Sequence, residues 1–334
     1  MRALVTGGAG FIGSALVKYW LRRDPSVRIV NLDKLTYSGD LARLGAIRSD
    51  PRHRFVKGDI CDPRAVKRAM RGCDVIVHLA AETHVDRSLL EAKVFFDTNL
   101  YGTYVLLEEA RRQGVKRFMH VSTDEVYGSR VSGFFRERDP MGPTSPYSVS
   151  KAGADLLALS YAHTHGLPVS VTRGSNTFGP YQYPEKVIPL FVSNALAGEP
   201  LPLYGDGLQV RNWMHADDHA AGILRVLKKG AAGEAYNLAT PHYLTNIDLT
   251  RRILRILGKP ESLIRPVKDR LGHDRRYALD TSKVRALGWR PGGDFAGSLR
   301  ETVLWYRDNH RWWEAIKEKS RDFKTYYRKA YSGR

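Results

Sequence analysis

Two acidic residues, Asp124 and Glu125, stand side by side just after an apolar segment with basic ends, residues 115–121. Such a segment is typical of a buried parallel strand. Because successive residues of a strand face opposite sides, two acids can serve one ligand only where the strand bends into a loop. Thr123 precedes the pair and offers a hydroxyl to the same ligand. Open α/β sheets bind ligands at such strand ends, so we predict a reactive site here; a solvated loop with a helix-capping aspartate is the alternative.

A glycine turn near the N-terminus predicts a second site. Gly7, Gly10 and Gly13 lie between a short apolar strand, residues 2–6, and a helical pattern, residues 14–23. Glycines at this spacing let the backbone turn tightly and approach a pyrophosphate, which then lies on a helix N-terminus. Because a strand precedes the glycines and a helix follows them, the motif is stronger evidence than the glycines alone.

The next predicted strand, residues 28–32, leads into Asp33, twenty residues beyond Gly13. A carboxylate at this position is expected to bind the adenosine ribose hydroxyls of a dinucleotide. An acid there also repels a 2′-phosphate, so we expect NAD rather than NADP. Neighbouring Lys34 weakens that preference a little.

Tyr147 and Lys151 form a third candidate group. Pro146 suits a helix start, and the pattern continues to His165, so Tyr147 and Lys151 lie four apart on one helical face. An unperturbed tyrosine has a pKa of about 10 and is a poor base at neutral pH. The Lys151 ammonium and a positive nicotinamide ring would both favour the phenolate. Lowering the pKa by about three requires roughly 4 kcal/mol of differential stabilisation.

The elements that must position these groups alternate between strand and helix. Further strands are predicted at residues 53–57, 74–79, 168–173 and 235–238, and further helices at residues 63–71, 90–113 and 216–229. This alternation predicts an α/β fold with a Rossmann-type doubly wound parallel sheet.

Beyond residue 173 the alternation loosens, and Pro and Gly become frequent. We therefore expect residues 1–175, with returning segments at about 214–240, to form an NAD-binding Rossmann domain. Residues 176–213 and 241–334 are expected to form a smaller C-terminal α/β substrate-binding domain.

The composition is that of an ordinary globular protein, with 334 residues, 43% of them hydrophobic and 26% charged. No apolar run approaches the roughly 18 residues of a membrane span, and no signal peptide precedes the first strand, so we expect no membrane association. Cys61 and Cys73 make neither a disulfide framework nor a metal motif. We therefore expect a cytoplasmic protein with reduced thiols and no bound metal.

Together, these motifs resemble an extended short-chain dehydrogenase/reductase and, more narrowly, the dTDP-glucose 4,6-dehydratases. The similarity runs from Val5 to about Trp313. The pair Asp124 and Glu125 is its most specific feature, because general epimerases of the superfamily usually have small or hydroxyl residues there. The other distinctive segments are residues 32–37, 78–88, 121–128, 179–186, 204–207 and 272–277.

The resemblance implies an NAD-dependent lyase that acts on a nucleotide sugar, with dTDP-glucose favoured. The C5 proton of the hexose becomes acidic only after C4 is oxidised to a ketone. Tyr147 is expected to take the O4 proton as a hydride leaves C4, while Thr123 and Lys151 hold and polarise O4. Glu125 is expected to remove the C5 proton, and Asp124 to protonate the departing C6 hydroxyl. Return of the hydride to C6 and of a proton to C5 then gives the 4-keto-6-deoxy sugar.

The resemblance also implies two sets of binding residues. For the cofactor they are Gly7, Gly10, Phe11, Ile12, Gly13, Asp33, Lys34, Leu35, Thr36, Asp59, Ile60, Leu79, Ala80, Ala81, Thr98, Tyr147 and Lys151. For the nucleotide sugar they are Thr83, Asn176, Lys186, Val187, Pro202, Leu203, Tyr204, Arg211, Asn246, Asp269, Arg270 and His273.

Some of these assignments have structural alternatives. Arg211 and Arg270 are the best diphosphate ligands, because guanidinium pairs with phosphate oxygens in a two-pronged fashion, although surface charge is the alternative. His273 could equally be a core or surface histidine. On local grounds, Asp59 could instead cap the helix predicted at residues 63–71.

Three positions depart from the family pattern. Thr177 replaces the second of two adjacent asparagines, which belongs to the nicotinamide side of the site. Gly174 stands where a small thiol or hydroxyl residue is common. Phe323 falls near a family tyrosine whose role we do not transfer.

Other functions fit parts of the sequence. A UDP-glucose 4,6-dehydratase, or another NAD-dependent nucleotide-sugar epimerase or decarboxylase, would use the same superfamily machinery. The formal net charge of +18 raises an NAD-bound nucleic-acid-binding protein as a remote alternative. Because the Lys and Arg residues are spread along the chain, and a substrate with two phosphates suits them equally well, we expect no nucleic-acid partner. Family members are commonly dimers through two helices, here residues 90–113 and 146–165, so a homodimer is expected.

Overall fold

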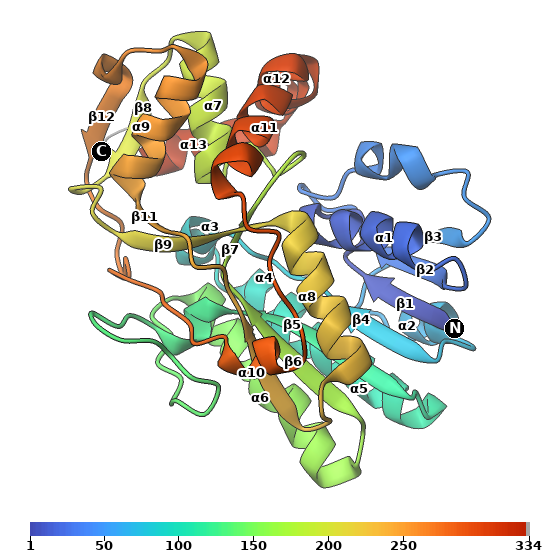
Figure 1. Ribbon diagram of the computed structural model, residues 1–334. Helices are drawn as coiled ribbons and strands as arrows, with labels where there is room; N and C mark the ends of the chain where they lie inside the picture. Colours follow the sequence, from blue (N-terminus) through green and yellow to red (C-terminus); the bar gives the residue numbers. More distant parts are fainter. Residues whose placement is uncertain (332–334) are drawn as a thin grey trace.

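The structure is a computed structural model that describes residues 1–331, and a seven-stranded parallel sheet lies at its centre (Figure 1). The strands of this sheet are, in chain order, β1 (Arg2–Thr6), β2 (Arg28–Asp33), β3 (His53–Lys57), β4 (Val75–His78), β5 (Arg117–Thr123), β6 (Val169–Gly174) and β10 (Glu234–Leu238). Across the sheet they run in the order β3-β2-β1-β4-β5-β6-β10. The predicted Rossmann-type sheet is confirmed.

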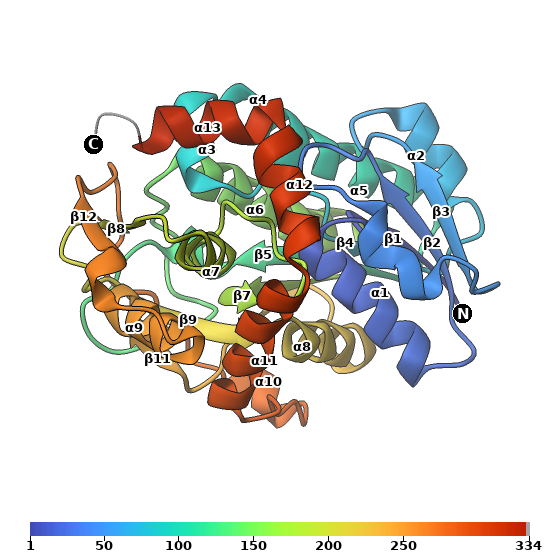
Figure 2. The same cartoon turned by 90° about the horizontal axis from the view of Figure 1, so that it is seen from above.

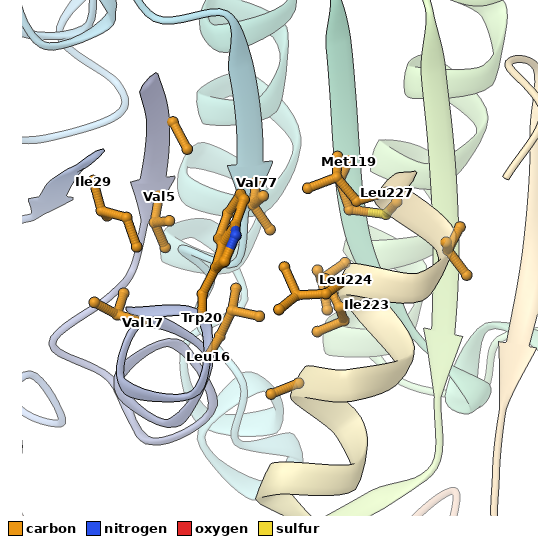
Figure 3. Close-up of a cluster of buried hydrophobic side chains, with 14 of the residues drawn as sticks. Val5, Leu16, Val17, Trp20, Ile29, Val77, Met119, Ile223, Leu224 and Leu227 are labelled. Atoms are coloured by element: carbon orange, nitrogen blue, oxygen red, sulfur yellow. The ribbon is translucent and has the colours of Figure 1, made fainter. Parts of the chain in front are cut away.

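Helices cover both faces of the sheet (Figure 2). They are α1 (Phe11–Arg23) and α8 (Ala216–Lys229) on one face, and α2 (Pro63–Met70), α5 (Gly102–Gln113) and α6 (Pro146–His165) on the other. Figure 3 shows Trp20 of α1 and Leu224 of α8 packed against Val5 and Val77 of the sheet. These strands are apolar on both faces because both faces are covered.

The strand order reverses between β1 and β4, whose neighbours on the outer sides are β2 and β5. In open α/β sheets, ligands bind at such a reversal, outside the carboxyl ends of the strands. The glycine turn follows β1, and the acidic pair follows β5. The fold therefore brings both predicted sites to one edge of the sheet.

The remainder of the chain builds a second region beside this edge. It contains two small sheets, β7 (Asn176–Phe178) with β9 (Val210–His215) and β11 (Tyr243–Thr245), and β8 (Leu201–Tyr204) with β12 (Ile264–Val267). Its helices are α7 (Val187–Ala197), α9 (Asn246–Leu257), α11 (Phe295–Asp308), α12 (His310–Lys319) and α13 (Arg321–Tyr331). Phe178, Trp213, Leu249 and Val303 share its core. The short helix α10 (Ser282–Ala286) and Trp289 return to the core under α8.

The long helix predicted at residues 90–113 is interrupted. The structure has α3 (Val85–Leu90), α4 (Lys93–Phe95) and a π-helical turn, Phe96–Tyr101, before α5. Apolar periodicity alone does not reveal a π turn, which adds one residue to a helical turn and is frequent at functional sites. Here the turn orients Asn99, whose side chain bonds both backbone groups of Glu82 at 2.8 and 3.0 Å.

Within residues 1–331, no helix is long and apolar enough to cross a membrane.

Candidate active site

The acidic pair lies where β5 ends and a 3₁₀ turn, Asp124–Tyr127, begins. The Thr123 hydroxyl accepts the backbone N–H of Glu125 at 3.3 Å and donates to Asp124 Oδ1 at 3.2 Å. This bend turns both carboxyl groups into one cleft, which they line together with Thr123. The expected change of direction at the strand end is confirmed.

The two carboxyl groups have different electrostatic surroundings. Burial and the neighbouring Glu125 raise the pKa of Asp124 to about 8, with Arg211 opposing the rise. Burial also raises the pKa of Glu125, but Arg270, Arg211 and Lys186 favour its carboxylate form. Asp124 Oδ2 is buried without a hydrogen-bond partner in the structure. The arrangement holds a proton on Asp124 while leaving Glu125 beside several cations.

Helix α6 presents the tyrosine and lysine to the same cleft. Ser145 caps the helix through a reciprocal bond with Ser148, and Pro146 occupies the first turn, as predicted. Tyr147 and Lys151 both line the cleft. These residues therefore reach the acids of β5 from the neighbouring helix.

The protein alone does not lower the pKa of this tyrosine. Burial and Glu125 raise the pKa of Tyr147, and a hydrogen bond with Thr123 opposes the rise. Burial lowers the pKa of Lys151 to about 8, with Asp155 opposing it. The Lys151 ammonium donates to the carbonyl of Val121 at 2.8 Å. Burial dominates the pKa of Tyr147, and Lys151, which bonds the Val121 carbonyl, does not offset it.

A buried ion pair fixes α6 against the sheet. Arg173 of β6 donates from Nε and Nη2 to the two carboxylate oxygens of Asp155 at 2.8 and 2.9 Å. Its Nη1 also donates to the Tyr127 hydroxyl at 2.7 Å. Tyr127 ends the 3₁₀ turn that carries the acids, so one guanidinium joins α6, β6 and that turn.

The cofactor half of the cleft is built by the glycine turn. A Cβ added to Gly13 would lie 2.1 Å from the Gly7 carbonyl oxygen, and one on Gly7 would lie 2.6 Å from Ala80 N. Asp33 accepts the N–H groups of Ala9 and Leu35 at 2.9 and 2.8 Å. The turn is thus held close to the end of β4, and the backbone is open to a phosphate-bearing ligand.

All but one of the residues predicted for the cofactor line the cleft. The exception is Leu35, which has a left-handed backbone (φ 57°) and packs against the core under α1. Asp59 pairs with Lys34 at 2.7 Å, and the residue that caps α2 is Asp62. The capping alternative for Asp59 is therefore wrong. A dinucleotide fits this lining.

The residues predicted for the nucleotide sugar are more dispersed. Thr83, Asn176 and Lys186 line the cleft, and Asn176 Oδ1 is buried without a hydrogen-bond partner. The others lie in the second region and do not line the same cleft: Val187, Pro202, Leu203, Tyr204, Arg211, Asn246, Asp269, Arg270 and His273. The Leu203 side chain belongs to the second core.

Polar contacts link part of this second set to Asp86 of α3 and to neighbouring residues of the second region. Arg270 Nη1 lies 3.5 Å from Asp86 Oδ1, and the Tyr204 hydroxyl donates to Asp86 Oδ2 at 2.7 Å. His273 Nδ1 lies 2.5 Å from Asp269 Oδ1. Arg211 is buried over the Tyr277 ring and donates to the Val210 and Asp274 carbonyls.

Several cleft residues were missed by the sequence analysis. Glu185 accepts the Tyr37 hydroxyl at 3.0 Å and Arg87 Nε at 2.8 Å, and it lines the cleft with Arg43 and His219. Glu185 and Arg87 lie in segments that carry the family resemblance, which was the available signal. Arg43 and His219 lie outside every motif.

The comparisons with known proteins agree with this geometry. Residues 4–302 match the model of a family described as GDP-mannose 4,6 dehydratase. The dTDP-glucose 4,6-dehydratase of Streptomyces antibioticus is 52% identical over 96% of each chain. The dTDP-glucose 4,6-dehydratase of Escherichia coli is 44% identical over 96% of this chain and 97% of its own. The chain belongs to the dTDP-glucose 4,6-dehydratase family.

Solved structures of this family and its superfamily have the same fold. A dTDP-glucose 4,6-dehydratase of Streptomyces venezuelae, crystallised with NAD among its ligands, has a TM-score of 0.93 and 53% identity, covering 95% of this chain and all of its own. An NAD complex of the UDP-glucose 4-epimerase of Thermus thermophilus has a TM-score of 0.85 and 32% identity, covering 92% and 100%. The fold is thus shared with epimerases, whereas sequence identity is higher with the dehydratases.

Proposed function

We propose that this protein is an NAD-dependent dTDP-glucose 4,6-dehydratase, a lyase that converts dTDP-glucose to its 4-keto-6-deoxy derivative. The observation that carries the proposal is the pair of buried Asp124 and half-buried Glu125, side by side in the cleft that Tyr147 and Lys151 also line. Oxidation and elimination need a hydride acceptor, an acid and a base at one hexose. This cleft offers a dinucleotide-binding glycine turn, an acid and a base.

The residues divide the reaction between them. NAD held at the glycine turn would supply the chemistry of hydride acceptance from C4 and hydride donation to C6, and a proton would return to C5. Tyr147 takes the O4 proton, with Thr123 and Lys151 holding that oxygen. Glu125 removes the C5 proton and Asp124 protonates the C6 hydroxyl, so that water leaves across C5–C6. General acid–base steps of this kind each contribute about a hundred- to ten-thousandfold.

The electrostatics support this division of roles. An acid needs its proton at neutral pH, and burial together with Glu125 raises the pKa of Asp124 to about 8. A base needs its carboxylate, which three nearby cations stabilise at Glu125. Burial raises the pKa of both acids, and the three cations limit the rise at Glu125, which favours Asp124 as the acid and Glu125 as the base.

The remaining binding roles follow the same proposal. The residues that line the cleft around the glycine turn hold the cofactor, and the predicted residues of the second region hold the nucleotide sugar, with Arg211 and Arg270 on its diphosphate. We also propose the corresponding division into a Rossmann domain of residues 1–175, with segments at about 214–240, and a substrate domain of residues 176–213 and 241–334.

Incubation with dTDP-glucose and UDP-glucose in separate reactions tests the function directly. We expect the alkali-induced absorbance of a 4-keto sugar from dTDP-glucose, and none from the Glu125→Gln variant. Turnover of UDP-glucose alone would reassign the nucleotide. A gel shift that persists at moderate salt without any sugar turnover would favour the nucleic-acid-binding alternative.

We further propose a homodimer formed through the helices on one face of the sheet. Leu90 of α3, Tyr101 and Tyr104 next to and within α5, and Val149 and Leu156 of α6 are each at least 41% exposed. We call these five residues the helical surface. Helices α5 and α6 pack side by side. An apolar surface of this kind marks a protein interface.

A cytoplasmic location is part of the same proposal. Both cysteines, Cys61 and Cys73, are free. Reduced thiols are the rule in the cytoplasm.

A further inference from the structure

Three arginine side chains are buried to 5% exposure or less, and they differ in their partners. Arg173 has a two-pronged ion pair with Asp155. Arg211 and Arg43 have no carboxylate within ion-pair distance among residues 1–331. The predicted partner of Arg211 is the substrate diphosphate, whereas Arg43 has no assigned role.

Arg43 lies in the 3₁₀ helix Leu41–Ile47 that follows β2. Its Nε donates to the Tyr181 carbonyl at 3.0 Å, and its Nη1 donates to the carbonyls of Ala9 and Ser38 at 3.1 and 2.5 Å. Ala9 belongs to the glycine turn. The guanidinium is therefore fixed against the turn on which a pyrophosphate is expected to lie.

One end of this guanidinium is left without a bond. Nη2 is buried and has no hydrogen-bond partner in the structure, although Arg43 lines the cleft. Asp40 and Asp33 are near enough to act on it electrostatically, but the carboxylate oxygens of Asp40 bond Ala42 N and Trp312 Nε1, and those of Asp33 bond Leu35 N and Ala9 N.

Such an environment is costly without an anion. An unpaired buried charge costs several kcal/mol. A buried donor that makes no hydrogen bond adds the desolvation free energy of that group. Arginine stays charged in proteins, so it cannot escape this cost by losing its proton. A phosphate oxygen in the cleft would satisfy both the charge and the free N–H group.

We infer that Arg43 is a cofactor-binding residue, and that its Nη2 donates to the pyrophosphate of the bound NAD. The inference rests on the proposed NAD site, and it adds a side-chain cation to the backbone N–H groups of the glycine turn. The three carbonyl bonds hold the guanidinium against the turn. Because Nη2 is buried, the contact requires a small shift of this group toward the ligand.

The test compares ligands that differ only in phosphate. The full-length protein is freed of bound nucleotide, and ADP and adenosine are titrated against a fluorescent etheno-NAD. The variants are Arg43→Met, which keeps the length of the side chain, and Arg48→Met, an exposed arginine just after the same 3₁₀ helix. We expect Arg43→Met to weaken ADP and NAD at least tenfold and adenosine less than twofold, with Arg48→Met unchanged.

A merely structural role gives a different pattern. If Arg43 only joins three carbonyls, Arg43→Met would lower the unfolding temperature of the nucleotide-free protein and weaken adenosine as much as ADP, which would overturn the inference. Unchanged ADP affinity would overturn it too, as would a wild type that binds neither ADP nor NAD. Because no sugar is present, loss of sugar turnover alone, with the ADP effect intact, contradicts the proposed function and leaves this inference standing.

Discussion

The hydroxyl of Thr177 lies 2.8 Å from Nδ1 of His219. The Thr177 hydroxyl also lies 3.2 Å from the Ser175 carbonyl, so it joins that carbonyl to the His219 ring. His219 Nε2 is buried and has no hydrogen-bond partner in the structure, and His219 lines the cleft. Burial lowers the pKa of His219 to about 4, so the ring is neutral at physiological pH.

We expect Thr177→Val to destabilise the protein by about 1–3 kcal/mol, because it leaves His219 Nδ1 buried without its hydrogen-bond partner. Thr177→Ser keeps the hydroxyl and should stay close to the wild type. The measurement is urea unfolding of both variants without nucleotide. Equal stability of Thr177→Val and Thr177→Ser would show that the hydroxyl bond is unimportant.

Glu125→Gln should reduce turnover of dTDP-glucose by at least about a hundredfold, since an amide cannot remove the C5 proton. NAD content should not change, because the substitution preserves shape. Stopped assays for the 4-keto product and absorbance of the purified protein give the two readouts. Glu301→Gln, at an exposed position of α11, is the matched control. Turnover within threefold of the wild type would remove Glu125 as the base.

The acid role of Asp124 predicts a pH dependence of the rate. Since its pKa is raised to about 8, the group loses its proton above that pH, and turnover should fall about tenfold for each further pH step. Asp124→Asn should be at least about a hundredfold slower and should lose this alkaline limb. Initial rates from pH 6 to pH 10 provide the comparison, and an unchanged limb in the variant would assign it to another group.

The raised pKa of Asp124 also predicts how the stability of the protein depends on pH. A carboxyl whose folded pKa is raised from 3.8 to about 8 holds its proton more tightly in the native state, so its effect on stability becomes unfavourable as pH rises through that window. Asp124→Asn should therefore gain stability over the wild type at pH 8.5 and much less at pH 5. Urea unfolding at both pH values measures the difference, and the opposite ordering would contradict the raised pKa.

The proposed dimer is tested on the helical surface. Leu156 is 58% exposed on α6, and Leu156→Glu should shift the mass from dimer to monomer in light scattering. Leu271→Glu changes an even more exposed leucine in the loop after β12 and should not alter the mass. A wild-type chain that is monomeric at micromolar concentration would refute the dimer itself.

Much of the central sheet could be predicted because its signals are local. Strands β1 and β3 and helices α6 and α8 have the predicted bounds, since apolar runs between Gly, Pro and polar residues define them. The acidic pair and the Tyr–Lys spacing were likewise readable from the sequence. The π-helical turn was not, because it changes the period of an apolar pattern by one residue without a composition signal.

The missed cleft residues have a different cause. Arg43 is followed by Leu44 and Ile47, whose side chains face the core, so nothing local shows that a cation faces inward as well. His219 meets Thr177 across 42 residues of chain, and its ring fills the space that a side chain at Gly174 would occupy, with a Cβ there only 2.6 Å away. Both depend on tertiary packing, which composition and spacing do not encode.

The two-pronged ion pair between Arg173 and Asp155 has a consequence for how this enzyme binds its sugar. Because that guanidinium also holds Tyr127, the tyrosine–lysine helix and the acid-bearing turn are clamped together before any ligand arrives. Because the reactive groups are already ordered, none of the binding energy of the hexose is used to order them. The reactive groups are therefore already in place when the hexose binds, and only the orientation of the hexose remains to be set.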